Sequence, residues 1–185
     1  IKYMNIIKTK INGVLLVKNN TFDDVRGKLI QSLNSKILEE TNLRMKPNLT
    51  LITHSHQNTI RGMHNQYRNP QDKLVTVIDG KIQDVVIDLK ESSSTFASYE
   101  SFEITGKTGY SLFIPHWCAH GFLTKTKKSI ICYNINNEYD PESQQTIKWD
   151  DGIIDIKWEI SKKSSVILSK KDRLGINFVQ SHFFK

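Results

Sequence analysis

The stretch of sequence that decides the fold is Leu74-Val-Thr-Val-Ile78, followed by Asp79-Gly80 and then by Ile82-Gln-Asp-Val-Val-Ile-Asp-Leu89. Both apolar runs have the length and composition of buried β-strands. Asp-Gly between two such runs is a strong hairpin signal, because glycine accepts the positive φ that a tight turn requires. We therefore predict two strands joined as a β-hairpin.

Further short β-type runs flank this stretch, with turn signals between them. They cover residues 11–17, 99–104, 110–114, 129–133 and 146–149. Helical signals are few: Asn34 can cap a short helix over residues 35–40, and another begins near Ser169, with Asp172 three residues on as in a capping box. With no linker or internal repeat, residues 1–185 are predicted to form one all-β domain, a jelly-roll β-sandwich with a few short helices.

The composition, with 38% hydrophobic and 24% charged residues in 185, is typical of a soluble globular protein. The net charge of +7 is compatible with three kinds of binding partner, which are nucleic acid, a membrane surface and a small anion. Lysine supplies 21 of the 26 basic residues, and these form no stripe interleaved with aromatics, which disfavours nucleic acid. No stretch approaches the roughly 18 apolar residues of a membrane span. A small anionic substrate is the remaining expectation.

The N-terminus has no signal-peptide pattern, because lysines interrupt its apolar residues, and Met4 is a candidate for the first native residue. The two cysteines, Cys118 and Cys132, do not make a disulfide framework. We therefore expect a cytoplasmic protein.

Several histidines could carry chemistry. His54-Ser-His56 has a spacing that places both rings on one face of a strand, which could begin a metal site; the alternative is that both lie in a polar loop. His64 and His120 could be a base and an acid, or ordinary structural side chains, and Tyr133 could be a plain strand aromatic. Spacing alone does not show whether these residues converge.

Seven blocks of sequence occur in an order that points to one family. They are Arg61-Gly-Met-His64, Lys73-Leu-Val75, Pro115 to Phe122 with Ala-His-Gly-Phe, Tyr133, Tyr139-Asp-Pro-Glu142, Ile147-Lys-Trp-Asp-Asp151 and Leu168-Ser-Lys-Lys-Asp172. Over about residues 4–175 the chain resembles the dTDP-4-dehydrorhamnose 3,5-epimerase family of cupins. This resemblance implies a jelly-roll subunit, a homodimer, and no metal or other cofactor.

The resemblance also implies a reaction, the inversion of C3 and C5 in a nucleotide-linked 4-keto-6-deoxy sugar through an enolate. It makes His64 the base, with Asp172 orienting it, and Lys73 the cation beside the enolate oxygen. Tyr133 would return a proton to the opposite face of the sugar. The substrate-binding residues it implies are Arg26, Gln31, Thr53, Arg61, His120, Tyr139, Gln144 and Lys171.

The departures from the family pattern fall mostly where the nucleotide base is read. In Asp24-Val-Arg-Gly-Lys-Leu-Ile-Gln31, Leu29 stands where the family has an aromatic residue and Gln31 where it has Glu. Where the family has Gln-Asp-Asn, this chain has Leu51-Ile52-Thr53, and Gln144 stands where the family has a further Glu. Near the chemistry, Asn65 replaces a Phe, and His116-Trp-Cys118 replaces Glu-Gly-Phe.

These departures lead to the hypothesis of a GDP-linked substrate, GDP-6-deoxy-4-keto-heptose, in the synthesis of capsule or another surface polysaccharide. The alternatives are a C3-only epimerase, a sugar-nucleotide ketoisomerase and a non-catalytic sugar-binding cupin. The Arg-Gly-x-His and Lys-Leu-Val blocks disfavour the ketoisomerase.

Overall fold

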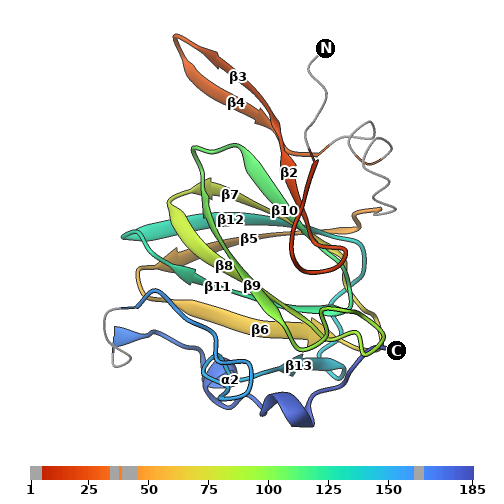
Figure 1. Cartoon of the computed structure of the whole chain (residues 1–185). Helices are drawn as coiled ribbons and strands as arrows, with labels where there is room; N and C mark the ends of the chain where they lie inside the picture. The colour runs from red at the N-terminus through yellow and green to blue at the C-terminus, as the bar shows by residue number, and fades with distance from the viewer. Residues whose placement is uncertain (1–5, 34–37, 39–45, 161–164) are drawn as a thin grey trace.

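The structure is a computed structural model that describes residues 6–33, 38, 46–160 and 165–185. It is built almost entirely from antiparallel strands (Figure 1). The strands are β1 (Ile6–Lys8), β2 (Leu15–Lys18), β3 (Asn20–Asp24), β4 (Gly27–Gln31), β5 (Leu49–His56), β6 (Ile60–Gln66), β7 (Lys73–Asp79), β8 (Lys81–Asp88), β9 (Tyr99–Thr105), β10 (Tyr110–Ile114), β11 (Cys118–Thr124), β12 (Lys128–Ile135) and β13 (Gln144–Thr146). Two short helices follow, α2 (Lys170–Arg173) and the 3-10 helix η2 (Phe178–Gln180).

Two sheets pack face to face as a jelly-roll sandwich, which confirms the predicted fold class. One has the order β1-β2-β10-β7-β12-β5 and the other the order β13-β6-β11-β8-β9. The main core lies between them and includes Val75 and Ile131 from the first sheet, and Val86 and Phe122 from the second. This apolar layer supports the inward-facing polar residues described below.

The hairpin predicted at Asp79-Gly80 is wrong. The two strands form, but β7 lies in the six-stranded sheet and β8 in the five-stranded sheet. β7 pairs with β10 and β12, and β8 pairs with β9 and β11, so neither strand has an edge left for the other. Gly80 turns the chain from one sheet to the other with φ +84°, and a Cβ there would lie 2.3 Å from the carbonyl oxygen of Lys128.

Other predicted elements are partly correct. Residues 11–14 form a turn that is closed by a hydrogen bond from the N–H of Val14 to the carbonyl oxygen of Ile11. Only the second half of the predicted strand 11–17 is therefore extended. The strand predicted over 146–149 covers only residues up to Thr146. Helix α2 begins after Ser169, as predicted, and the Ser169 hydroxyl accepts the N–H of Asp172, while the Asp172 carboxylate contacts His64. The helix predicted over 35–40 lies outside the described residues, except for position 38.

Two parts of the chain extend the sandwich. The hairpin β3–β4 projects away from both sheets (Figure 1). At the opposite side, residues after β13 cover the outer face of the five-stranded sheet, where Ile154 and Phe178 pack on Met63 and Ile87. This covering segment brings α2 into contact with β6. Among the described residues, no helix is long and apolar enough to cross a membrane.

Candidate active site

A cavity of about 230 Å3 lies between the two sheets and gathers most of the predicted site residues. Those that line it are Thr53, Arg61, His64, Lys73, His120, Tyr133, Tyr139 and Gln144. They come from both walls, since His64 and His120 lie on the five-stranded sheet and Lys73 and Tyr133 on the six-stranded sheet. Strands distant in the sequence therefore bring these side chains together.

His64 is paired with Asp172 at one wall of this cavity. Its Nε2 lies 2.5 Å from Asp172 Oδ1, and the two side chains are 29% and 5% exposed. Gly62 allows β6 to approach β11 at this point, because a Cβ there would lie 2.5 Å from the Cα of Gly121. The helix cap at Ser169 holds the turn that presents Asp172. His64 is thereby oriented by a buried carboxylate.

Burial lowers the pKa of His64, and the hydrogen bond and charge of Asp172 partly offset this by raising it. The nearby cations Lys73 and Lys171 lower the His64 pKa further. For Asp172, burial raises the pKa, but the hydrogen bond and charge of His64, together with hydrogen bonds from Ser169 and Gly62, leave its pKa below the ordinary value. At neutral pH this combination gives a neutral imidazole beside an ionised carboxylate, which is the state of a general base.

Lys73 begins β7 and its side chain is buried beside His64. Its Nζ donates to the backbone oxygen of His64 at 3.4 Å. Burial lowers the pKa of Lys73 to about 8, and electrostatic interactions with Cys118, Asp84 and Asp72 oppose that effect. A buried ammonium with a pKa in this range is suited to stabilise an oxyanion in the cavity.

Tyr133 on β12 and His120 on β11 come from opposite sheets, and their ring centroids are 6.0 Å apart. Burial, followed by the charge of Asp84, raises the pKa of Tyr133, so its phenol stays protonated well above neutral pH. His120 Nε2 contacts both carboxylate oxygens of Asp84, at 2.9 and 3.0 Å, and both side chains are buried. Asp84 was missed at the sequence level, although an Asp inside the apolar run 82–89 was an available signal.

Two cations stand at the rim of the cavity. Lys171 Nζ lies 2.5 Å from Gln144 Oε1 and 3.2 Å from the Tyr139 hydroxyl. Arg61 donates to Ser55 Oγ at 3.0 Å and to a backbone oxygen. Within the described part of the chain, the side-chain partners of both cations are uncharged. Their charges are therefore available to an anionic ligand.

Arg26 and Gln31 are not brought to this cavity. They lie on the projecting hairpin, where Arg26 pairs with Asp24 at 2.5 Å and is 86% exposed. Gln31 accepts a hydrogen bond from Asn20 across the hairpin at 3.4 Å. Within one subunit they are separated from the catalytic candidates, because β3 and β4 leave the sandwich (Figure 1).

His54 and His56 both lie on β5 with exposed side chains, so the alternative of a polar loop is wrong. Residues 6–33, 38, 46–160 and 165–185 contain no group of three or more His, Cys, Asp or Glu side chains that could hold a metal ion. The described structure therefore gives His54 and His56 no partners for a metal site.

Comparisons with known proteins identify the family of the chain. The sequence model of the family "dTDP-4-dehydrorhamnose 3,5-epimerase" matches residues 8–180. The dTDP-4-dehydrorhamnose 3,5-epimerase of Shigella flexneri is 34% identical over 184 residues, which are 98% of this chain and 99% of that protein. The corresponding protein of Methanothermobacter thermautotrophicus is 34% identical over 167 residues, which are 90% of each chain.

Solved structures show the same similarity. The 3,5-epimerase of Legionella pneumophila, in complex with dTDP-4-keto-L-rhamnose, matches with a TM-score of 0.89 and 29% identity over 94% of this chain and 92% of that one. The Bacillus anthracis dTDP-4-dehydrorhamnose 3,5-epimerase, with TDP and PPi bound, has a TM-score of 0.89 and 30% identity over 95% and 99%. The chain therefore belongs to the dTDP-4-dehydrorhamnose 3,5-epimerase family, and it is a carbohydrate epimerase with the jelly-roll fold of that family.

Proposed function

We propose that this cavity inverts C3, C5 or both in a nucleotide-diphosphate 4-keto-6-deoxy sugar, by proton transfer through an enolate. The observation that carries the proposal is the convergence of the His64–Asp172 pair, Lys73 and Tyr133 on one cavity from two opposing sheets. The reaction needs no cofactor in this scheme, because the C4 ketone of the substrate itself acidifies the protons on C3 and C5.

The energetics explain why a base alone is insufficient. A carbon acid beside a ketone and an imidazole differ by roughly a dozen pKa units, or on the order of 16 kcal/mol of uphill transfer. Charge must therefore be stabilised on the enolate oxygen as it forms. Lys73 is the candidate, since its ammonium is buried and lies close to His64.

Inversion requires the proton to return on the opposite face of the sugar ring. His64 lies on the five-stranded sheet and Tyr133 on the six-stranded sheet, so the base and the proposed acid occupy opposite walls of the cavity. The raised pKa of Tyr133 keeps its proton available at neutral pH for transfer to a strongly basic carbanion. His120 would contact the sugar beside Lys73.

The rim cations support binding of a diphosphate. Arg61 and Lys171 have no carboxylate partner among the residues described, and both reach the cavity or its lining side chains. In this proposal they contact the two phosphates, with Tyr139 and Gln144 beside them. Thr53 lines the same cavity on β5 and would contact the substrate there.

We propose a homodimer in which Arg26 and Gln31 of one subunit serve the nucleotide of the other. The projecting hairpin supports this, because Phe22 and Leu29 are each 60% exposed and Val25 is fully exposed, an unusual arrangement for an isolated element. Light scattering of the purified chain should give twice the subunit mass. A monomer with full activity would contradict this part of the proposal.

For the nucleotide we propose GDP, and for the substrate a 6-deoxy-4-keto-heptose of capsule synthesis, acted on in the cytoplasm. The support is the loss of the aromatic residue and the Glu at Leu29 and Gln31, and the apolar Leu51 in the cavity lining. Calorimetric titration with GDP and dTDP tests this. Tighter binding of dTDP would leave the dTDP-linked sugar, which the names of the relatives specify, as the substrate.

One experiment separates the reaction alternatives. The enzyme is incubated with a 4-keto-6-deoxy sugar nucleotide in D2O and the product is weighed by mass spectrometry. Two deuterons indicate exchange at C3 and C5, and one indicates a C3-only epimerase or another single-centre enzyme. No uptake with either GDP- or dTDP-linked sugars would contradict the proposal, and His64→Ala should abolish uptake.

A further inference from the structure

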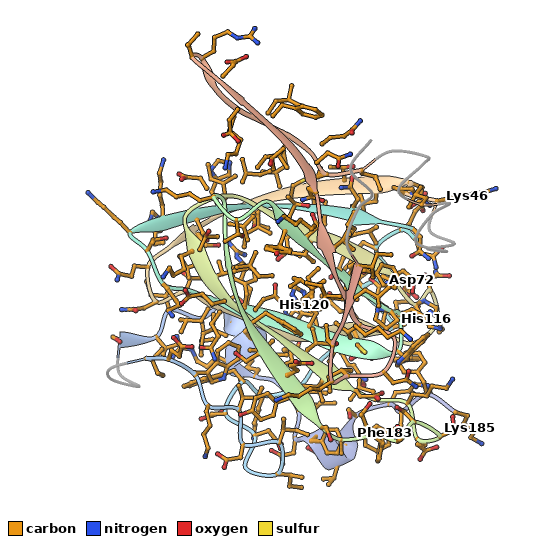
Figure 2. All side chains as sticks on the ribbon, turned by 45° about the horizontal axis from the view of Figure 1, so that its top comes forward. Lys46, Asp72, His116, His120, Phe183 and Lys185 are labelled. Atoms are coloured by element: carbon orange, nitrogen blue, oxygen red, sulfur yellow. The ribbon has the colours of Figure 1, made fainter. Side chains whose placement is uncertain are left out.

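A set of hydrogen bonds surrounds the carboxylate of Asp72, directly before Lys73. One oxygen accepts the backbone N–H of His116 at 2.7 Å and lies 3.0 Å from His116 Nδ1. The other oxygen accepts from Asn136 Nδ2 at 2.9 Å, and the Asp72 N–H donates to Asn136 Oδ1 at 2.9 Å. Figure 2 shows Asp72 and His116 side by side at one end of the sandwich, with His120 further inside. We call this set the Asp72 clasp.

The clasp joins three segments that each lead to the cavity. Asp72 precedes β7, which begins at Lys73. His116 lies in the turn before β11, which carries His120. Asn136 follows β12, which carries Tyr133. A carboxylate with this many partners is costly to disturb, because each lost contact leaves a partly buried polar group unpaired.

We propose that Asp72 is a positioning residue for the epimerase reaction, which fixes the Lys73 ammonium relative to the groups on β11 and β12 by clamping the start of β7. The inference rests on the role proposed above for Lys73. Asp72 itself does not line the cavity and would not touch the substrate.

Electrostatics give the clasp a second effect on Lys73. The titratable groups that face this ammonium are His64, Cys118, Asp84 and Asp72. Burial raises the pKa of the Cys118 thiol well above its usual value, so the thiol is neutral where Lys73 titrates. Asp84 and Asp72 are then the anions that help to keep the ammonium charged as the pH approaches 8.

Asp72→Asn tests the inference, because the amide keeps the size of the side chain and one acceptor but removes the charge. With a 4-keto-6-deoxy sugar nucleotide, we expect kcat at pH 7.5 to fall about 3- to 10-fold, and the basic limb of the pH–rate profile to move down by roughly half a unit. Lys73→Arg shows that this limb reports Lys73, since a guanidinium stays charged and the limb should disappear. His116→Ala removes one contact of the Asp72 clasp but keeps the Asp72 charge. It should therefore lower kcat without moving the basic limb of the pH–rate profile.

Unchanged kcat and an unchanged basic limb in Asp72→Asn would overturn the inference. A lower melting temperature with the limb unmoved would also overturn it, because it would show a merely structural contact. If Lys73→Met keeps full deuterium exchange, the role of Lys73 in the proposed function fails and the inference falls with it. If Lys73→Met is inactive and Asp72→Asn is like the wild type, only the inference fails.

Discussion

The contact between Asp172 and His64 is the one whose loss has the most direct expected consequence. In Asp172→Asn the amide oxygen can still accept from His64 Nε2, so the ring keeps its orientation while the buried negative charge disappears. Asp172 is 5% exposed on its side chain, and solvent cannot replace that charge effectively. The substitution therefore isolates the electrostatic support that the base receives when it becomes an imidazolium.

The magnitude follows from the type of hydrogen bond. A hydrogen bond to a charged group is worth about 1.5–3 kcal/mol, and it is needed most when His64 has taken the proton. At about 1.4 kcal/mol per tenfold, the expected loss in kcat is roughly 10- to 150-fold. KM should change little, because Asp172 does not line the cavity.

The pH dependence has a defined sign. Asp172 raises the pKa of His64 against the lowering effect of burial, so removing its charge lowers that pKa further. A general base acts in its neutral form, and the acid limb of kcat/KM should therefore move to lower pH in Asp172→Asn. The variant would be slower at its plateau and active to lower pH.

The assay is the initial rate of deuterium uptake by the sugar nucleotide, measured at several pH values. Ser169→Ala is the matched control, since it removes the cap of α2 and keeps the carboxylate. It should cost about 1 kcal/mol of stability and lower the rate somewhat by loosening the turn that presents Asp172, but the acid limb should stay near its wild-type pH because the charge is retained. A wild-type rate and an unmoved acid limb in Asp172→Asn would refute the reasoning.

Three further predictions concern other parts of the molecule. Tyr133→Phe should keep exchange but reduce the inverted product about 100-fold, with little change in melting temperature; equal loss of both would remove Tyr133 as the acid. Gln144→Glu should pair with Lys171, raise KM about tenfold and leave kcat nearly unchanged; steady-state kinetics at fixed ionic strength decide this. Gly80→Ala should lower the free energy of unfolding by at least about 1–3 kcal/mol in urea titration, because of the positive φ and the close oxygen of Lys128; wild-type stability would contradict it.

The sequence predicted most side chains of the candidate site, including Asp172 as the partner of His64, but not the burial that sets their pKa values. His64, Lys73 and Tyr133 carry chemistry that is recognisable from residue type and order along the chain. Their environment depends on burial and on neighbours from other strands, as with the pKa of Lys73 near 8. Asp84 was missed because its partner, His120, is 36 positions away and meets it only across β8 and β11.

Strand prediction succeeded where the β pattern is clear, as in the largely apolar runs of β7 and β8 and the alternating run of β9, and failed where it is weak. The buried strands β7 and β8 have long apolar runs and were predicted. The strands β5 and β11 contain polar or small residues, such as His54 and Gly121, and their local patterns are weak. Pairing with β12 holds β5 extended, and pairing with β8 and β6 holds β11 extended.

The sequence by itself determined the fold class and the family, since these depend on local periodicity and on the order of side-chain types, and the resemblance to that family supplied the candidate reactive groups. Tertiary structure alone decided that Leu74–Ile78 and Ile82–Leu89 lie in opposite sheets, and that Arg26 lies far along a projecting hairpin. The physical reason is that each strand edge bonds to whichever partner packing brings to it. β10, β12, β9 and β11 occupy the edges that a local hairpin would have used.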